Sequence, residues 1–124
     1  MAVSQIILTN QDALSYTGEK FKGDGYYGYA DGLHTVSFHV SQFLGRLHLE
    51  ATLMEEPTED DWFAIDLSPT VSYLEYSSAT SDTQGVTFTG NFVWLRGRVD
   101  RSHLTATSYD PTVHGRMDKI VLLK

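Results

Sequence analysis

The stretch HTVSFHVSQFLGRLHLEATL, residues 34–53, alternates apolar and polar side chains on both sides of a short break at QFLG. Alternation with a period of two is typical of a β-strand that has one face in the core and one in solvent. We therefore predict two strands that pair as a hairpin around QFLG and keep all apolar partners on one face. The expected partners are Val40 and Leu47, Phe38 and Leu49, and Val36 and Ala51.

The same alternation recurs along most of the chain. The further strands expected are SQIILT (4–9), WFAIDL (62–67), VSYLEYS (71–77), VTFTGNFVWLRGRV (86–99) and GRMDKIVLLK (115–124). Residues that favour turns gather between them, in EEPTEDD (55–61), SPT (68–70) and SATSDTQG (78–85). The first and last strands are strongly apolar, so we expect both in the interior of a sheet and near each other.

Length and composition bound the architecture. With 124 residues, 41% of them hydrophobic, the chain has the size of one folded domain, residues 1–124. No segment shows a helical period for more than about two turns. Seven to nine short strands predict an all-β, antiparallel β-sandwich of jelly-roll-like form, because a sheet with one apolar face buries it against a second sheet. A small closed barrel is the alternative.

Charge and composition also restrict the function. A net charge of −7 disfavours nucleic acid as a partner, since phosphate binding needs a concentrated basic surface. No apolar run approaches the roughly 20 residues that span a bilayer, and the N-terminal MAVSQIILTNQD is expected to form a strand rather than a signal peptide, so no membrane partner is expected. Cysteine is absent, which excludes disulfides and thiolate chemistry.

The segment GDGYYGYADG, residues 23–32, combines turn-forming Asp-Gly pairs with three tyrosines. Tight turns around a short aromatic strand are the favoured interpretation. The alternative is a ligand site in which tyrosines stack on a sugar ring and aspartates accept from its hydroxyl groups. Its residues would be Asp24, Tyr26, Tyr27, Tyr29 and Asp31.

Two weaker patterns concern metals. The acidic EEPTEDD segment offers oxygen ligands of the kind calcium takes, but a solvated loop is the favoured interpretation. In the predicted hairpin His39 and His48 fall opposite each other, as a zinc pair would need, although a metal-free surface pair is favoured. We expect no metal and no cofactor.

Catalytic motifs are missing from the sequence. It holds no GxSxG elbow, no GxxxxGK[ST] loop and no HExxH pair, and GDGYYG lies in a β context that does not suit dinucleotide binding. We therefore expect no catalytic residues and no enzyme activity.

The run NFVWLRGRVDR, residues 91–101, predicts a strand whose two faces differ. One face is expected to join the core through Val93, Leu95, Gly97 and Val99. The other would carry Phe92, Trp94, Arg96 and Arg98, which are the predicted interface residues, because Trp and Arg are enriched where proteins contact each other. Two alternatives stay open: both faces are covered within the sandwich, or a bulge at Gly90 shifts the phase and places Trp94 in the core.

A resemblance to a known class is carried by four runs: GDGYYGYADGLHTVSFHVSQFLGRLHLEATL, PTEDDWFAIDL, GNFVWLRGRVDR and GRMDKIVLLK. Together they resemble small β-sandwich structural proteins of tailed bacteriophages, especially those encoded in marine phage genomes. The shared pattern is a strand ending in ATL, an acidic Pro loop, a WF strand, an F-x-W-L-R strand and a closing strand that begins at Gly. Discoidin-like and other carbohydrate-binding sandwiches are similar in their alternating strands and late Trp.

The resemblance implies a non-enzymatic virion component that is made in the host cytoplasm. Such a protein would assemble with copies of itself, as a homo-oligomer, or with other virion proteins. The alternative is a carbohydrate-binding module that recognises host-surface glycans through the tyrosine segment.

Overall fold

The computed structural model describes residues 4–11, 14–23, 33–67, 72–104 and 108–123. The strands are β1 (Ser4–Gln11), β2 (Tyr16–Thr17), β3 (Phe21–Lys22), β4 (Leu33–Thr52), β5 (Phe63–Ala64), β6 (Leu74–Thr89), β7 (Trp94–Asp100) and β8 (Arg116–Leu123). A 3-10 turn, η2 (Glu59–Asp61), and the single-turn α1 (Pro111–His114) complete the described elements. The predicted all-β class and strand number are confirmed.

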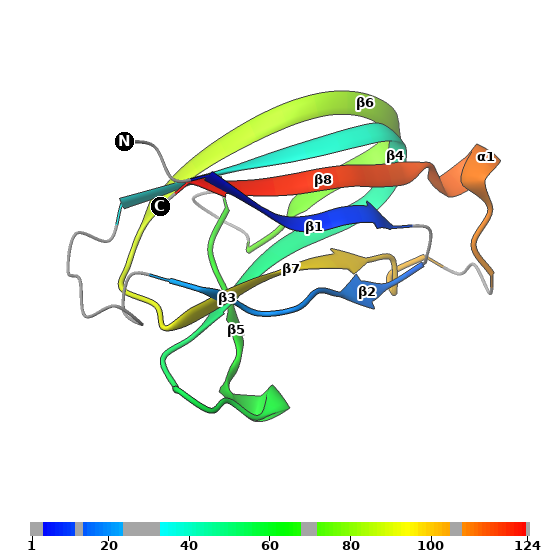
Figure 1. Ribbon diagram of the computed structural model, residues 1–124. Coiled ribbons are helices and arrows are strands. Elements are labelled where there is room, and N and C mark those ends of the chain that lie inside the picture. Colours follow the sequence, from blue (N-terminus) through cyan, green and yellow to red (C-terminus); the bar gives the residue numbers. More distant parts are fainter. Residues whose placement is uncertain (1–3, 12–13, 24–32, 68–71, 105–107, 124) are drawn as a thin grey trace.

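The strands form one antiparallel sheet that curls into two layers, as in a sandwich (Figure 1). Its order is β1-β8-β4-β7-β2, with β3 paired to β7 and both β5 and β6 paired to β4. The upper layer contains β1, β8, the first half of β4 and the last part of β6. The lower layer contains the second half of β4, β7, β2, β3, β5 and the start of β6.

The predicted hairpin around QFLG is wrong, because β4 runs through this segment as one strand of 20 residues. Strand β6 lies opposite both halves of it, from the pair Leu33 and Thr89 to the pair Leu47 and Leu74. Positive φ angles at Gln42 (50°) and Gly45 (145°), with register shifts between them, bend the strand instead of reversing it. The bend carries β4 from the upper to the lower layer, and apolar alternation continues in each half.

A buried arginine holds this bend in place. Arg101 is 2% exposed and donates from Nε to the Leu44 carbonyl at 2.6 Å and from a terminal nitrogen to the His114 carbonyl at 2.9 Å. Its guanidinium lies 4.5 Å from the centre of the Phe43 ring. A Cβ at position 45 would lie 2.7 Å from Arg101 Cγ, so both the φ angle and the packing require Gly45.

Three other boundaries differ from the prediction. SATSDTQG, expected as a turn, lies inside β6, because the long β4 offers it a continuous partner that overrides its turn propensity. The strand expected over 86–99 is divided at Gly90, where φ is 151°, into the end of β6 and β7. WFAIDL contributes only the two residues of β5, and SPT lies outside the described residues.

The predicted proximity of the two ends is confirmed, since β1 pairs with β8 from Ser4 and Leu123 to Gln11 and Met117. β8 lies inside the sheet as expected. β1 is instead at the end of the strand order, and a register shift between Ile6 and Leu8 turns both Ile7 and Leu8 into the core.

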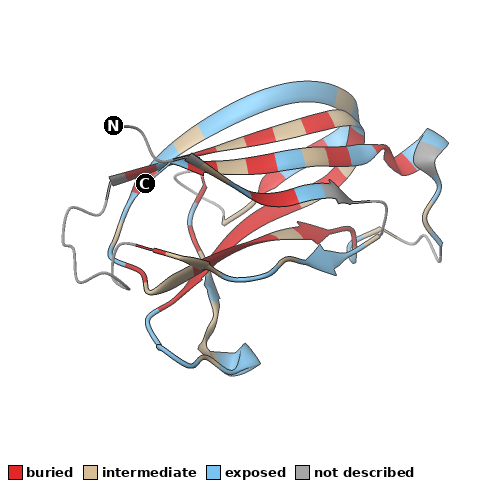
Figure 2. Cartoon of the chain, in the orientation of Figure 1, coloured by how far each residue is buried: buried red, intermediate tan, exposed pale blue. Residues whose placement is uncertain are grey.

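One hydrophobic core fills the space between the layers (Figure 2). Its fully buried apolar side chains come chiefly from β4, β7 and β8: Val36, Phe38, Phe43, Leu47, Leu49, Leu95, Val99, Met117, Ile120 and Leu122. The layers approach closely, because a Cβ on Gly97 of β7 would lie 2.8 Å from Ile120 Cδ1 of β8. The exposed side chains therefore lie on the outer faces and at the ends of the sandwich.

Candidate functional site

The structure separates the four predicted interface residues into two environments. Trp94, Arg96 and Arg98 lie on the outer face of the lower layer, since the alternate residues Leu95 and Val99 are fully buried. The predicted two-faced pattern is confirmed for this part of the strand.

Phe92 departs from that pattern. It precedes β7, is 8% exposed and packs its ring 6.2 Å from Phe88 and 6.0 Å from Phe63. The placement of Phe92 beside Trp94 is therefore wrong, because the break at Gly90 changes the phase before β7 begins. Val93, expected in the core, is half-buried and donates its backbone hydrogen to the Thr52 carbonyl at 3.0 Å.

Arg96 is the best-connected side chain of the outer face. It donates from Nε to Glu50 Oε1 at 2.8 Å and from its two terminal nitrogens to Glu59 at 3.2 and 3.1 Å. Its guanidinium also lies 4.1 Å from the centre of the Trp62 ring. Hydrogen bonds from Arg96 lower the pKa of Glu59, which stays charged beside the guanidinium. Arg96 is thus covered and neutralised within the chain, so the alternative of a covered face holds at this residue, whereas Arg98 is half-buried.

The ion-pair network continues along the face through Arg98. Arg98 lies 3.4 Å from Glu50 Oε2 and 3.7 Å from Asp100 Oδ2. Asp100 Oδ2 is in turn 3.4 Å from His48 Nε2, and its Oδ1 accepts from the Ser102 backbone at 2.8 Å. Burial lowers the pKa of His48, and Arg98 lowers it further against the pull of Asp100. His48 is therefore held neutral near physiological pH.

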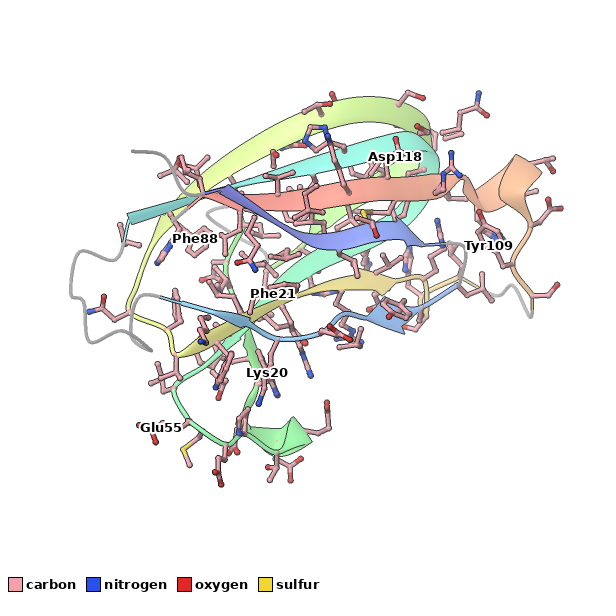
Figure 3. The ribbon with its side chains drawn as sticks, viewed as in Figure 1. Lys20, Phe21, Glu55, Phe88, Tyr109 and Asp118 are labelled. Carbon is pink, nitrogen blue, oxygen red and sulfur yellow. The ribbon has the colours of Figure 1, made fainter. Side chains whose placement is uncertain are left out.

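Trp94 is half-buried under the segment that follows β4. Its Nε1 donates to the Glu55 carbonyl at 2.9 Å, and Lys20 Nζ lies 4.4 Å from the ring centre. Figure 3 shows Glu55 at the lower end of the molecule, with Lys20 between it and the sheet. The EEPTEDD segment is exposed as expected, but it is anchored to β7 at Trp94 through Glu55 and at Arg96 through Glu59.

Large apolar side chains are exposed at this same end of the sandwich. Leu53 is 62% exposed, Met54 52% and Phe63 43%. Phe63 pairs with Ala51, and Leu53 follows two residues later on the same face, so both extend the core side beyond the end of the sheet. We call Leu53, Met54 and Phe63 the tip surface. The exposure of these three side chains could not be predicted from the sequence, because it depends on where β4 and β5 end.

The ionisable side chains of the lower face pair with one another. Glu50, Asp100 and both arginines are held in ion pairs, and His48 and Asp100 are each 9% exposed. The described part of the chain holds no group of three His, Asp or Glu side chains arranged for a metal ion. The predicted pairing of His39 with His48 is wrong, since His39 pairs with Thr83 and Lys119 in the upper layer and His48 with Arg98 in the lower.

A further prediction concerned the tyrosine site in GDGYYGYADG. Asp24, Tyr26, Tyr27, Tyr29 and Asp31 lie outside the described residues, and the glycan interpretation stays a prediction.

A groove separates the two sheet ends, between β1 and the β2–β3 segment. Its lining comes from Ile6, Ile7, Leu8, Thr9, Tyr16, Glu19 and Phe21. The cavity volume is about 200 Å³, below the roughly 300 Å³ at which small-molecule sites begin. The tip surface is therefore the stronger candidate for a binding site.

Helices that could span a membrane are not found in the described ranges, where α1 has four residues. No family model matches the chain, and no curated protein or solved structure shows significant similarity to it.

Proposed function

We propose that the chain is a non-catalytic structural protein of a tailed bacteriophage particle, made in the host cytoplasm, that binds another virion protein through the tip surface. The single observation that carries the binding role is the exposure of Leu53, Met54 and Phe63, three large apolar side chains at or just beyond the ends of the paired strands β4 and β5. Exposed apolar side chains that gather at one place and are rimmed by polar groups mark interaction sites. The virion setting follows from the resemblance of the sequence.

The charges around the tip surface specify the partner. Glu55 and Glu56, which directly follow Met54 in the chain, are exposed. These carboxylates repel the phosphates of nucleic acids and of anionic lipid headgroups, so a protein is the partner that fits. The partner surface should present an apolar pocket with lysine or arginine at its rim, because complementary charge orients a complex and speeds its formation.

Trp94 links the tip surface to the ion-paired face beneath it. Its hydrogen bond to the Glu55 carbonyl holds the segment that carries Leu53 and Met54 against β7. Trp94→Ala should weaken partner binding by releasing this segment, while the core residues on the other face of β7 keep the fold.

The test is the composition of purified particles of the phage whose genome encodes the chain. Quantitative mass spectrometry should find the wild-type chain at several copies per particle, and Leu53→Ser with Met54→Ser should reduce that number strongly. The matched control is His103→Ala, an exposed residue beyond the end of β7 opposite to Trp94. Absence of the wild-type chain from particles, or unchanged incorporation of the folded double variant, would overturn the proposal.

A further inference from the structure

The outer face of the upper layer carries a row of small and apolar side chains across four strands. The register places Ile6 of β1 beside Val121 of β8, Val121 beside Ser37 of β4, and Ser37 beside Gly85 of β6. Ile6 is 51% exposed and Gly85 is exposed, at the two ends of the row. Strand spacing of about 4.8 Å separates them by roughly 14 Å.

The next row toward the chain ends is also without charge. It runs from Leu123, 40% exposed, to Thr35 and Thr87. In the third row, on the other side, Lys119 lies beside His39 and Thr83. Further charges begin where Asp118, labelled in Figure 3, pairs with Arg116 at 3.4 Å. Two adjacent rows of a chain with net charge −7 thus carry no charged side chain.

Hydroxyl groups on this face already have partners. Thr35 and Thr87 share a hydrogen bond of 3.0 Å between their Oγ1 atoms. Ser37 Oγ is 2.9 Å from His39 Nε2, and Thr83 Oγ1 is 3.3 Å from His39 Nδ1. Burying a hydroxyl that keeps its hydrogen bond avoids most of the cost of burying an unpaired one. The free-energy cost of desolvating this face is therefore small.

The position of Gly85 in the first row leaves space for another molecule to approach the outer face closely. A Cβ built on it would lie 3.9 Å from the nearest atom, the Val36 carbonyl oxygen, so the packing of the chain leaves room for a side chain. Its φ also lies outside the positive range, which appears only at Gly45, Gly90 and Gly115 among the described glycines. Glycine weakens a strand by about 0.5–1 kcal/mol relative to alanine and often marks a place where another backbone approaches. Neither φ nor internal contact requires it here.

We infer that two copies of the chain pack face to face through these two rows, which deepens the proposed function as an assembly protein. A two-fold axis parallel to the strands, between β8 and β4, would bring Ile6 of each copy over Gly85 of the other. The exposed apolar side chain of one copy then fills the hollow left by glycine in its partner, as a self-complementary interface requires. Sheets packed in this way stay within about 30° of parallel.

Charge favours a second copy as the occupant. Two copies that each carry −7 repel each other over their acidic surfaces, so they can meet most easily where charge is absent. The tip surface, with Glu55 and Glu56 beside it, would instead oppose like charges in a symmetric contact. The uncharged rows of the upper layer therefore serve self-association, and the tip surface binds a different protein.

The test is the molar mass of the purified full chain by light scattering on a sizing column over a concentration series. The wild type should be a dimer that dissociates on dilution. Gly85→Glu should raise the dimer dissociation constant by about tenfold or more, because it fills the hollow and opposes like charges. Ser77→Glu is the matched control, since it adds the same charge at an exposed residue of β6 outside these rows, and it should leave the dimer intact.

Ile6→Thr removes the other half of the contact without adding charge and should also favour the monomer. Thermal unfolding checks that each variant is folded. If Gly85→Glu does not fold, the dissociation constant of Ile6→Thr tests the inference in its place. A wild type that is monomeric at every concentration would overturn the inference, as would equal dissociation constants for Gly85→Glu and Ser77→Glu. A monomeric chain that still enters particles through the tip surface would refute only the dimer and leave the proposed function standing.

Discussion

Arg96 donates its Nε hydrogen to Glu50 Oε1 at 2.8 Å, and each side chain keeps only 10% of its surface exposed. This pair joins the two central strands of the lower layer beneath the η2 turn. Glu50→Ala should therefore destabilise the fold by about 3–5 kcal/mol, because it leaves a buried guanidinium without its closest carboxylate. Unfolding in urea, followed by tryptophan fluorescence, measures the loss.

Two further variants separate the pair from its surroundings. Glu50→Leu combined with Arg96→Leu should be far less harmful than Glu50→Ala, since no buried charge is left unpaired. Glu59→Gln should change stability little, because the Glu59 side chain is 83% exposed. A Glu50→Ala protein as stable as the wild type would contradict this account of the lower face.

The bend of β4 depends on Gly45 and Arg101 together. Gly45→Ala should cost about 1–3 kcal/mol, because alanine is strained at a φ of 145° and its Cβ would meet Arg101 Cγ at 2.7 Å. Arg101→Ala alone should also destabilise the fold, since it leaves the Leu44 and His114 carbonyls without this donor.

A double-mutant cycle tests whether the two residues act as a unit. Because part of the Gly45→Ala cost is a clash with Arg101, the double variant should lose less than the sum of the single losses. Full additivity would show that backbone strain alone explains the glycine.

Alternation predicted most of the core face of β4 and β7 from the sequence, because period-two burial is a local property of each strand. It could not tell a hairpin from a bend at QFLG, since glycine serves both and the outcome depends on the continuous partner strand β6. The β7 outer face was predicted at Trp94, Arg96 and Arg98. The partner of Arg96, Glu50, is 46 residues away and becomes evident only once the register of β4 and β7 is known.

The buried His48 should make stability depend on pH. Its folded-state pKa is lowered, first by burial and then by Arg98, below the ordinary value of 6.5. The unfolded chain then binds the proton more readily than the folded one. The free energy of unfolding that depends on neutral His48 is therefore fully present above about pH 7, and it is lost as the pH falls from 6.5 toward the folded-state pKa of His48. His48→Gln should flatten that part of the profile.

Thermal unfolding between about pH 5 and pH 8 checks this sign, a range above the window in which the lowered pKa of Asp100 acts. The control His103→Gln removes an exposed histidine instead. A wild-type profile that rises as the pH falls through this range, or one that His48→Gln leaves unchanged, would refute the assignment.

The glycan interpretation of the tyrosine segment makes its own prediction. If Tyr26, Tyr27 and Tyr29 stack on a sugar, host-surface polysaccharide should quench the intrinsic fluorescence in a saturable way, and Tyr27→Ala should abolish the effect while circular dichroism stays unchanged. Tyr16→Ala is the control, because Tyr16 is exposed on β2. Equal quenching in both variants would remove the glycan interpretation.

Contact at the tip surface is the central claim, and site-specific photo-cross-linking in intact particles tests it most directly. A photoreactive amino acid in place of Met54 should form cross-links to one other virion protein, whereas the same group in place of the exposed His103 should not. Particles that contain the chain but give no cross-link from position 54, or the same products from both positions, would contradict the claim.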